Sequence, residues 1–155
     1  MKESYPLIDY LYEHKENRAM LANLRRCLGK VRGDVAAYPY VVPFLPKKNF
    51  TDHIYFSVAG LFGLHPESTS DQTQTIGKAF AQLSDTDSRN KRFKALLDAE
   101  GGAFLYHLRQ AISLLKSHEI KINYQLLLHD MLYWDHPERF IQLQWARDFW
   151  GKVNN

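Results

Sequence analysis

Large apolar residues recur every three or four positions along most of the chain, which is the spacing that gathers side chains on one face of an α-helix. In the N-terminal part this pattern predicts helices through residues 7–12, 20–28 and 54–62. Asn49 and Thr51 stand ahead of the third helix, and either side chain can accept a hydrogen bond from its first amide groups. The first part of the chain is therefore expected to be helical.

Two segments interrupt this pattern. Residues 33–48 contain three prolines, which lack an amide hydrogen and end helices, so we expect a loop with at most one short helix. Residues 67–75 are the most polar run and hold no large apolar side chain. They are the best candidate for a linker between an N-terminal half, residues 1–66, and a C-terminal half, residues 76–155.

The helical spacing returns in the C-terminal half. It predicts helices over residues 76–83 and 88–99, a break at Gly101 and Gly102, and a long helix with an apolar stripe through residues 104–115. Residues 124–134 are apolar on nearly every side, so this helix is expected to be central, and Asn123 is placed to cap it.

Asp135, Pro137 and Glu138 are typical of the start of a helix, and the apolar spacing continues from there through Phe149. No segment alternates apolar and polar residues between turn signals, as a half-buried β-strand does. The sequence therefore predicts an all-α protein without internal repeats, either one helical bundle or two small lobes joined by the polar linker.

Composition agrees with a folded domain. The chain has 155 residues, of which 45% are hydrophobic and 24% charged, near the average of globular proteins. The first eleven residues carry Glu3 and Asp9 and do not resemble a signal peptide, and no window has the uncharged apolar length of a membrane span. The single Cys27 can form no intrachain disulfide. A cytoplasmic protein is expected, without a membrane partner.

Positive charge is concentrated in two segments although the net charge is only +3. Residues 15–34 carry a local net charge of +4 and residues 78–94 of +3, so the rest of the chain is acidic by −4. Such a distribution favours a basic working face and an acidic side for protein partners. A solvated surface without any ligand gives the same pattern, and the charges alone do not separate the two interpretations.

Motifs of catalysis are missing from the sequence. Gly77 and Lys78 match the last Gly-Lys pair of a phosphate-binding loop. However, Gln72 stands where that motif has its first glycine, and Ala79 stands where it has a serine or threonine. The seven histidines are scattered and none is spaced from another as zinc ligands are. We therefore expect no enzyme activity, no metal and no cofactor. A hydrolase with an unrecognised pair of carboxylates remains the weakest of the alternatives.

Several cations share helix faces. Arg18 and Arg25 lie two turns apart on one side of their helix, and Arg89 and Arg92 lie one turn apart with Lys91 between them. Side chains of this kind can follow a phosphate backbone without recognising bases.

Two structural alternatives remain for the cations. Arg25 and Arg26 could form salt bridges with nearby carboxylates, namely Glu13, Glu16 or Asp34. Arg109 and Lys116 could belong to an ordinary solvated helix face.

Six segments in order carry a resemblance to one family. They are Leu-Arg-Arg-Cys-Leu-Gly at 24–29, Thr-Ile-Gly-Lys-Ala-Phe at 75–80, Arg-Phe-Lys-Ala-Leu-Leu at 92–97, His-Leu-Arg-Gln-Ala-Ile at 107–112, the stretch 122–134 and Trp-Ala-Arg-Asp-Phe-Trp at 145–150. Together they resemble CasB, the small subunit of the type I-E CRISPR surveillance complex called Cascade.

The resemblance implies a non-catalytic, all-helical subunit, two copies of which contact the hybrid of guide RNA and target DNA and the displaced DNA strand. Its partners would be the other Cascade subunits, guide RNA and target DNA bound without regard to sequence. The matched motifs imply five contacts: Arg25, Arg26, Lys78, Arg92 and Arg109. Helix spacing alone adds four: Arg18, Arg89, Lys91 and Lys116. We expect these cations to meet in one groove. The alternative function is a helical adaptor that binds only proteins.

Overall fold

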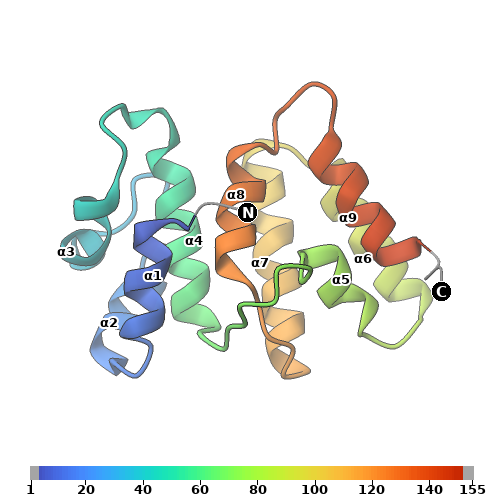
Figure 1. Cartoon of the computed structure of the whole chain (residues 1–155), viewed down its shortest axis with the longest axis horizontal. Helices are drawn as coiled ribbons and strands as arrows, with labels where there is room; N and C mark the ends of the chain where they lie inside the picture. Colours follow the sequence, from blue (N-terminus) through green and yellow to red (C-terminus); the bar gives the residue numbers. More distant parts are fainter. Residues whose placement is uncertain (1–3, 152–155) are drawn as a thin grey trace. The chain divides into compact units, whose positions relative to one another are not determined.

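The computed structural model describes residues 4–151, and every α-helix or 3₁₀-helix in that range lies in one of two compact units, Met1–Ser68 and Thr69–Asn155 (Figure 1). No β-strand is present in the described range, which confirms the all-α prediction. No helix in the same range is long and apolar enough to cross a membrane.

Three α-helices of more than one turn form the first unit. The elements are α1 (Pro6–Glu13), α2 (Arg18–Arg25), the 3₁₀-helix η1 (Val35–Ala37), α3 (Tyr38–Val41), η2 (Val42–Phe44), η3 (Asn49–Thr51) and α4 (Asp52–Leu64). Their apolar faces meet in a core in which Leu11, Leu24 and Phe62 are fully buried. The apolar residues whose spacing predicts helices in this half are therefore the ones that form its core.

The helices α2 and α4 touch through their backbones. A methyl group at Gly63 would stand only 2.7 Å from the carbonyl oxygen of Leu21 and 2.8 Å from the amide nitrogen of Arg25. A residue without a side chain is needed at this crossing, because any Cβ atom would force the two helices apart.

The proline-containing segment is more helical than expected. In place of a loop with at most one short helix, η1, α3 and η2 follow one another without a gap. Pro39 and Pro43 each occupy one of the first two positions of such an element. The amide hydrogen that proline lacks is not needed at a helix start, so these prolines set short helices instead of preventing them.

As far as residue 151, the second unit contains five helices: α5 (Ile76–Ala81), α6 (Asp87–Asp98), α7 (Gly101–Ser117), α8 (Tyr124–Leu132) and α9 (Phe140–Trp150). The expected cap is present, since the Asn123 side chain accepts a hydrogen bond from the amide of Leu126 at 3.1 Å. Six of the nine residues of α8 are buried, which confirms its central position. Between α6 and α9, the Phe93 and Phe149 rings stack at 4.2 Å.

Two helix boundaries differ from expectation. Gly101 and Gly102 do not break the helical structure but begin α7, and the turn lies at Ala99 and Glu100. The last helix begins at Phe140 instead of residue 135, because Arg139 has a left-handed backbone at φ 52°. Side-chain spacing locates a helix well, whereas such turns depend on bonds made elsewhere, here from the Trp134 indole to the Ala99 carbonyl at 3.1 Å.

The expected linker is largely part of the second unit. The amide of Thr69 bonds to the carbonyl of Ile122 at 3.0 Å, and the Asn123 side chain donates to the carbonyl of Asp71 at 2.8 Å. The Gln74 side chain donates to the carbonyl of Lys121 at 3.1 Å. A polar segment needs no apolar core when its own backbone supplies the acceptors, so polarity alone does not identify a free linker.

Candidate nucleic-acid interface

Arg25 ends α2 and bonds to the end of α4. Its guanidinium donates to the carbonyl oxygen of Gly63 at 3.0 Å, across the same crossing that requires glycine. Carbonyl groups in the last turn of a helix lack a partner within that helix. Arg25 therefore caps the C-terminal end of α4 and has a structural role in the first unit. Part of its side chain remains exposed.

Arg26 is held by a carboxylate. Its Nε lies 3.3 Å from Asp34, which also accepts from Lys30 and from the amide of Ala36 at 2.9 Å. The bond from Lys30 first, and then that from Ala36, hold the pKa of Asp34 below its usual value. Of the three carboxylates considered for Arg25 and Arg26, Asp34 is the one within ion-pair distance of Arg26.

Arg18 is the exception among the candidates of this unit. It opens α2, its side chain is exposed, and within residues 4–151 no hydrogen bond or ion pair engages it. It lies two turns from Arg25 on the same side of α2, as the spacing predicts.

In the second unit, Lys78 is occupied by the polar segment ahead of α5. Its ammonium lies 3.7 Å from a carboxylate oxygen of Asp71 and donates to the Thr73 hydroxyl. Hydrogen bonds from the Thr73 amide and hydroxyl are the main reason that the pKa of Asp71 is lowered. Lys78 thus fastens residues 71–73 to α5.

Arg89 is not free, although its spacing on α6 made it a candidate for contact with phosphates. Its side chain is only 12% exposed. It donates to the carbonyl of Leu83 and to Asp85, each at 3.0 Å, and its guanidinium lies 4.4 Å above the Phe149 ring. These partners come from two places in the chain, so Arg89 joins α6 to the turn before it and to α9.

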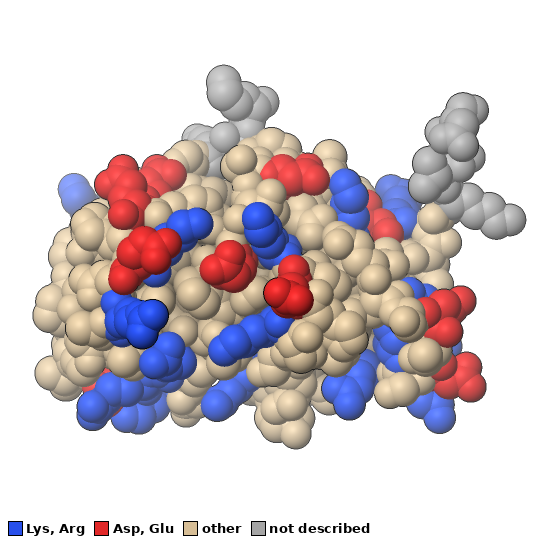
Figure 2. Space-filling model, turned by 90° about the horizontal axis from the view of Figure 1, so that it is seen from below, with Lys and Arg blue, Asp and Glu red and all other residues tan. Residues whose placement is uncertain are grey.

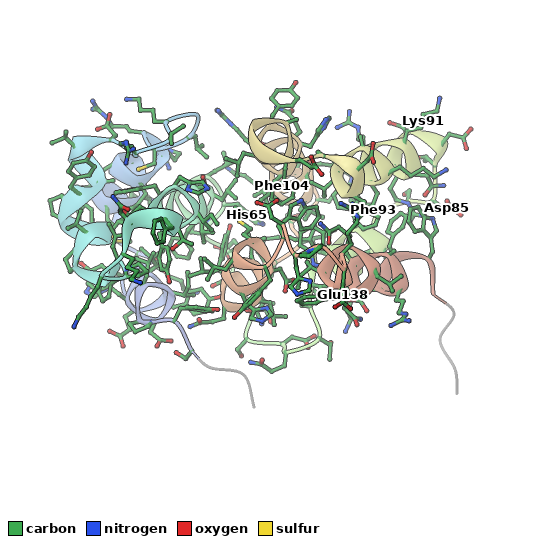
Figure 3. All side chains as sticks on the ribbon, turned by 90° about the horizontal axis from the view of Figure 1, so that it is seen from above. His65, Asp85, Lys91, Phe93, Phe104 and Glu138 are labelled. Carbon is green, nitrogen blue, oxygen red and sulfur yellow. The ribbon has the colours of Figure 1, made fainter. Side chains whose placement is uncertain are left out.

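Lys91 and Arg92 line a hollow between α6 and α7, together with His107 and Gln110; we call it the α6–α7 hollow, and its volume is about 230 Å³. No hydrogen bond or ion pair holds either cation within the described range. Figure 3 shows Lys91 on the outward side of α6, whereas Phe93 points inward to the aromatic core. The two cations therefore stand free at one edge of the hairpin.

A second hollow, of about 210 Å³, continues the same hairpin edge. Arg92 lines it too, with Ser88 and His118. His107 on α7 lines the first hollow and His118, just after the last residue of α7, lines the second, so each hollow has polar side chains in a mostly apolar lining. Their separation of eleven residues, about three helical turns, is the signal in the sequence that places them on one side of the helix.

Arg109 and Lys116 lie on another side of α7. At about 100° per residue, both are turned roughly 160–200° from His107, and therefore away from the α6–α7 hollow. Both side chains are exposed, and within the described part of the chain no hydrogen bond or ion pair engages them. The second unit thus carries free cations on two faces, not in a single groove.

Acidic side chains are mixed with the basic ones on the face shown in Figure 2. The nine candidates divide accordingly. Four are engaged by carboxylates, carbonyls, a hydroxyl or a ring: Arg25, Arg26, Lys78 and Arg89. Five are exposed without a partner among residues 4–151: Arg18, Lys91, Arg92, Arg109 and Lys116.

Chemistry other than charge is sparse in the described residues. Residues 4–151 contain no group of three or more metal-ligating side chains placed to hold an ion. The thiol of Cys27 is buried, and this burial raises its pKa above the usual value. A buried, protonated thiol is a poor nucleophile.

Comparison with known proteins gives one consistent result. The sequence model of the family described as CRISPR-associated protein Cse2 matches residues 20–150. A CRISPR-associated protein Cse2 of Thermus thermophilus is 34% identical over 123 residues, which are 74% of this chain and 68% of that protein. The crystal structure of a Cse2-family protein from Thermus thermophilus is similar with a TM-score of 0.83 and 31% identity, covering 98% of this chain and 100% of the other.

A chain in the structure of a CRISPR RNA-guided surveillance complex is also similar. Its TM-score is 0.79 at 25% identity, with 92% of this chain and 88% of that chain covered. Together the matches extend over both units.

Proposed function

Because the chain belongs to the Cse2 family of CRISPR-associated proteins, we propose that it is a non-catalytic small subunit of a Cascade surveillance complex in antiviral defence. In this role it contacts nucleic-acid backbones, namely the hybrid of guide RNA and target DNA and the displaced DNA strand. It works in the cytoplasm beside the other Cascade subunits and a second copy of itself. Its contacts stabilise the R-loop, the three-stranded structure formed when the target strand pairs with the guide.

The observation that carries this proposal is the hairpin of α6 and α7. Lys91 and Arg92 at its hollow, and Arg109 and Lys116 on the other side of α7, are exposed and without a carboxylate partner within residues 4–151. A cation that is already neutralised gains little from a phosphate, whereas a free one gains the full attraction and releases bound counterions.

The remaining candidates support this surface in a different way. Lys78 fastens residues 71–73 to α5, and Arg89 holds α6 against the turn before it and against α9. Among the candidates in the first unit, Arg18 has no partner within residues 4–151, and Arg25 and Arg26 are partly exposed after making their internal contacts. We propose that the five free cations contact phosphates and that the other four position them.

Modest contacts are sufficient for this function. Replacing DNA pairing by RNA–DNA pairing changes the free energy little, so a few backbone contacts can shift the balance toward the open R-loop. Contacts of this kind recognise phosphate and not bases, as a subunit that serves many guide sequences requires.

Binding of labelled DNA to the complex reconstituted with guide RNA, with and without this subunit, tests the proposal. The retention of a displaced-strand substrate should be greater with the subunit present, and the logarithm of the added affinity should fall linearly with the logarithm of salt concentration. An unchanged retention would contradict it. A contribution that does not change with salt would favour the adaptor that binds only proteins.

A further inference from the structure

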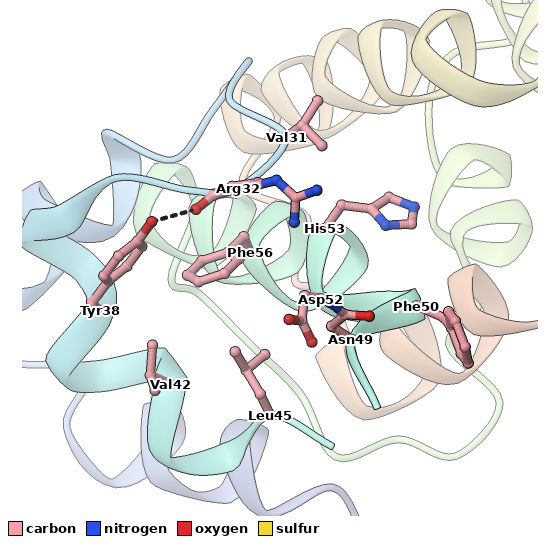
Figure 4. Close-up of a pocket in the computed structure, with 10 residues that line it drawn as sticks. All are labelled: Val31, Arg32, Tyr38, Val42, Leu45, Asn49, Phe50, Asp52, His53 and Phe56. Carbon is pink, nitrogen blue, oxygen red and sulfur yellow. Dashed lines mark hydrogen bonds between the residues drawn. The ribbon is translucent and has the colours of Figure 1, made fainter. Parts of the chain in front are cut away.

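Two hollows adjoin at the edge of the α6–α7 hairpin, because Arg92 lines both the α6–α7 hollow and the second hollow of about 210 Å³. No described aspartate or glutamate lines either of them, and the nearby Asp85 is bonded to Arg89. The first unit offers a contrast, since Asp52 as well as Arg32 lines its pocket of about 360 Å³ (Figure 4). The two hollows of the hairpin therefore suit an anionic ligand.

The α6–α7 hollow brings apolar and unpartnered polar side chains together. Ala95 of α6 and Ala111 of α7 have short side chains, and the buried Phe80 completes the apolar lining. The volume of about 230 Å³ is below the range of about 300–1,000 Å³ that sites for drug-sized ligands have, so it suits a single ring system. The polar lining residues make no hydrogen bond or ion pair within residues 4–151: Lys91, Arg92, His107 and Gln110.

The second hollow is lined by hydroxyl groups beside Arg92. Ser84, Thr86 and Ser88 come from the turn before α6 and from the first turn of that helix. The Thr86 hydroxyl accepts from the amide of Arg89 at 3.1 Å, whereas the exposed Ser84 and Ser88 form no side-chain hydrogen bond in the described range. Side-chain hydroxyls and guanidinium groups are common donors to the phosphates of nucleic acids. This hollow therefore matches a phosphate.

We propose that the two hollows together hold one unpaired nucleotide of the displaced DNA strand. Its phosphate lies in the second hollow, where Ser88 and Arg92 donate hydrogen bonds to it. Its base lies in the α6–α7 hollow against Ala95 and Ala111. A nucleotide carries its phosphate and its base next to each other, as two adjoining hollows require. Lys91, on the outward side of α6, meets the phosphate of a neighbouring nucleotide (Figure 3).

This inference rests on the proposed function and narrows it to one strand. In an R-loop the guide RNA and the target strand are paired with each other, so the displaced strand is the one that offers unpaired bases. A paired base can enter a pocket only after it leaves the helix, which costs the free energy of unpairing and unstacking. A site that takes a single base therefore favours the displaced strand over the hybrid of guide and target.

An acidic protein segment is the competing occupant, because its carboxylates would also complement Lys91 and Arg92. The side-chain amide of Gln110 favours a base. This amide both donates and accepts hydrogen bonds, and the edges of bases carry groups of both kinds. An ionised carboxylate only accepts, so it leaves the amide oxygen of Gln110 without a donor. The polar lining thus matches a nucleotide better than an acidic side chain.

Displaced strands with and without bases test the contact with the base. The complex reconstituted with guide RNA is bound to target DNA whose displaced strand is either complete or carries abasic nucleotides, which keep every phosphate. The complete strand should be retained at least fivefold more strongly, with the same slope of log affinity against log salt for both strands. Equal retention would overturn this inference. The proposed function would still stand if the retention of both strands required the subunit.

Matched variants assign the effect to the α6–α7 hollow. Ala95→Leu fills this hollow and leaves Lys91 and Arg92 in place, so the preference for the complete strand should be lost while the salt slope stays the same. Ala103→Leu is the control, because Ala103 is exposed on α7 and lines neither hollow. An equal preference in the two variants would contradict the inference. Circular dichroism of both variants confirms that α6 and α7 remain helical.

A photoreactive base identifies the occupant of the hollow directly. Thymines of the displaced strand are replaced by 4-thiothymine, which should crosslink to residues of α6 or α7 on irradiation. Ala95→Leu should reduce this crosslink at least fivefold. Crosslinks of the strand to other surfaces only would overturn the inference. If Ala95→Leu instead releases the subunit from the complex, and the wild type gives no crosslink, a protein segment occupies the hollow and the inference is wrong.

Discussion

The two units of the chain use their basic residues differently. In the first, Arg26 pairs with Asp34 and Arg25 binds a helix carbonyl, while exposed apolar residues line a pocket of mixed polarity. In the second, the hairpin of α6 and α7 leaves Lys91 and Arg92 without partners in the described range. The first unit has the larger local charge in sequence but fewer free cations. Pairing, and not the number of cations, decides where a phosphate can bind.

The largest expected effects come from changes that break one unit at a time. Gly77→Ala places a methyl group 2.1 Å from the carbonyl oxygen of Trp145, and Gly63→Ala places one 2.7 Å from that of Leu21. Each should destabilise the protein by about 3 kcal/mol, since backbone cannot yield as a flexible side chain does.

Hydrogen exchange measures both variants. Gly77→Ala should reduce protection in α5 and α9, and Gly63→Ala in α2 and α4, with the other unit less affected in each case. Equal loss of protection everywhere would show that the two units unfold together.

Arg89→Ala should have the next largest effect. It removes a charged bond to the Leu83 carbonyl and the contact with the Phe149 ring, and should lower the free energy of unfolding by about 2 kcal/mol. Denaturant titration measures this loss. Arg92→Ala is the matched control on the same helix and should change stability by less than about 0.5 kcal/mol.

Nucleic-acid binding should depend on the free cations, which contribute little to stability. Replacing Lys91 and Arg92 by alanine removes two free cations, so the slope of log affinity against log salt should fall by about 2 in the assembled complex. Arg26→Ala breaks an existing ion pair and should therefore change the slope of log affinity against log salt by less than about 0.5. A larger change of the slope for Arg26→Ala than for the Lys91 and Arg92 variant would contradict the statement that the second unit supplies the free cations.

The smallest expected effect is a pH dependence in the first unit. Because the folded-state pKa of Asp34 is lowered, its contribution to stability is complete above the ordinary aspartate pKa of about 3.9. It is lost as the pH falls through the lowered value. The difference in unfolding free energy between wild type and Asp34→Asn should be constant above about pH 5 and shrink below about pH 4.

Local patterns were sufficient for most helices. The cap at Asn123 and the buried α8 follow from residues within a few positions of each other. The starts of α7 and α9 were missed because they depend on distant bonds, such as that of the Arg139 guanidinium to the Leu97 carbonyl at 2.7 Å. Predictions from sequence therefore succeed where the cause is local.

The candidate site shows the same division. The pairing of Arg26 with Asp34 was one of the alternatives left open by the sequence, in which the two are eight residues apart. The engagement of Arg89 by Phe149 was not, since sixty residues separate them. A charge pattern finds cations, but only tertiary structure shows which remain free.

A photo-crosslinking amino acid at Ala95, in the α6–α7 hollow, tests the central claim most directly. In the reconstituted complex with guide RNA and target DNA, it should crosslink to nucleic acid, and the crosslink should disappear when Lys91 and Arg92 are alanine. Protein alone crosslinked from Ala95, under conditions in which target DNA is fully bound, would contradict the account.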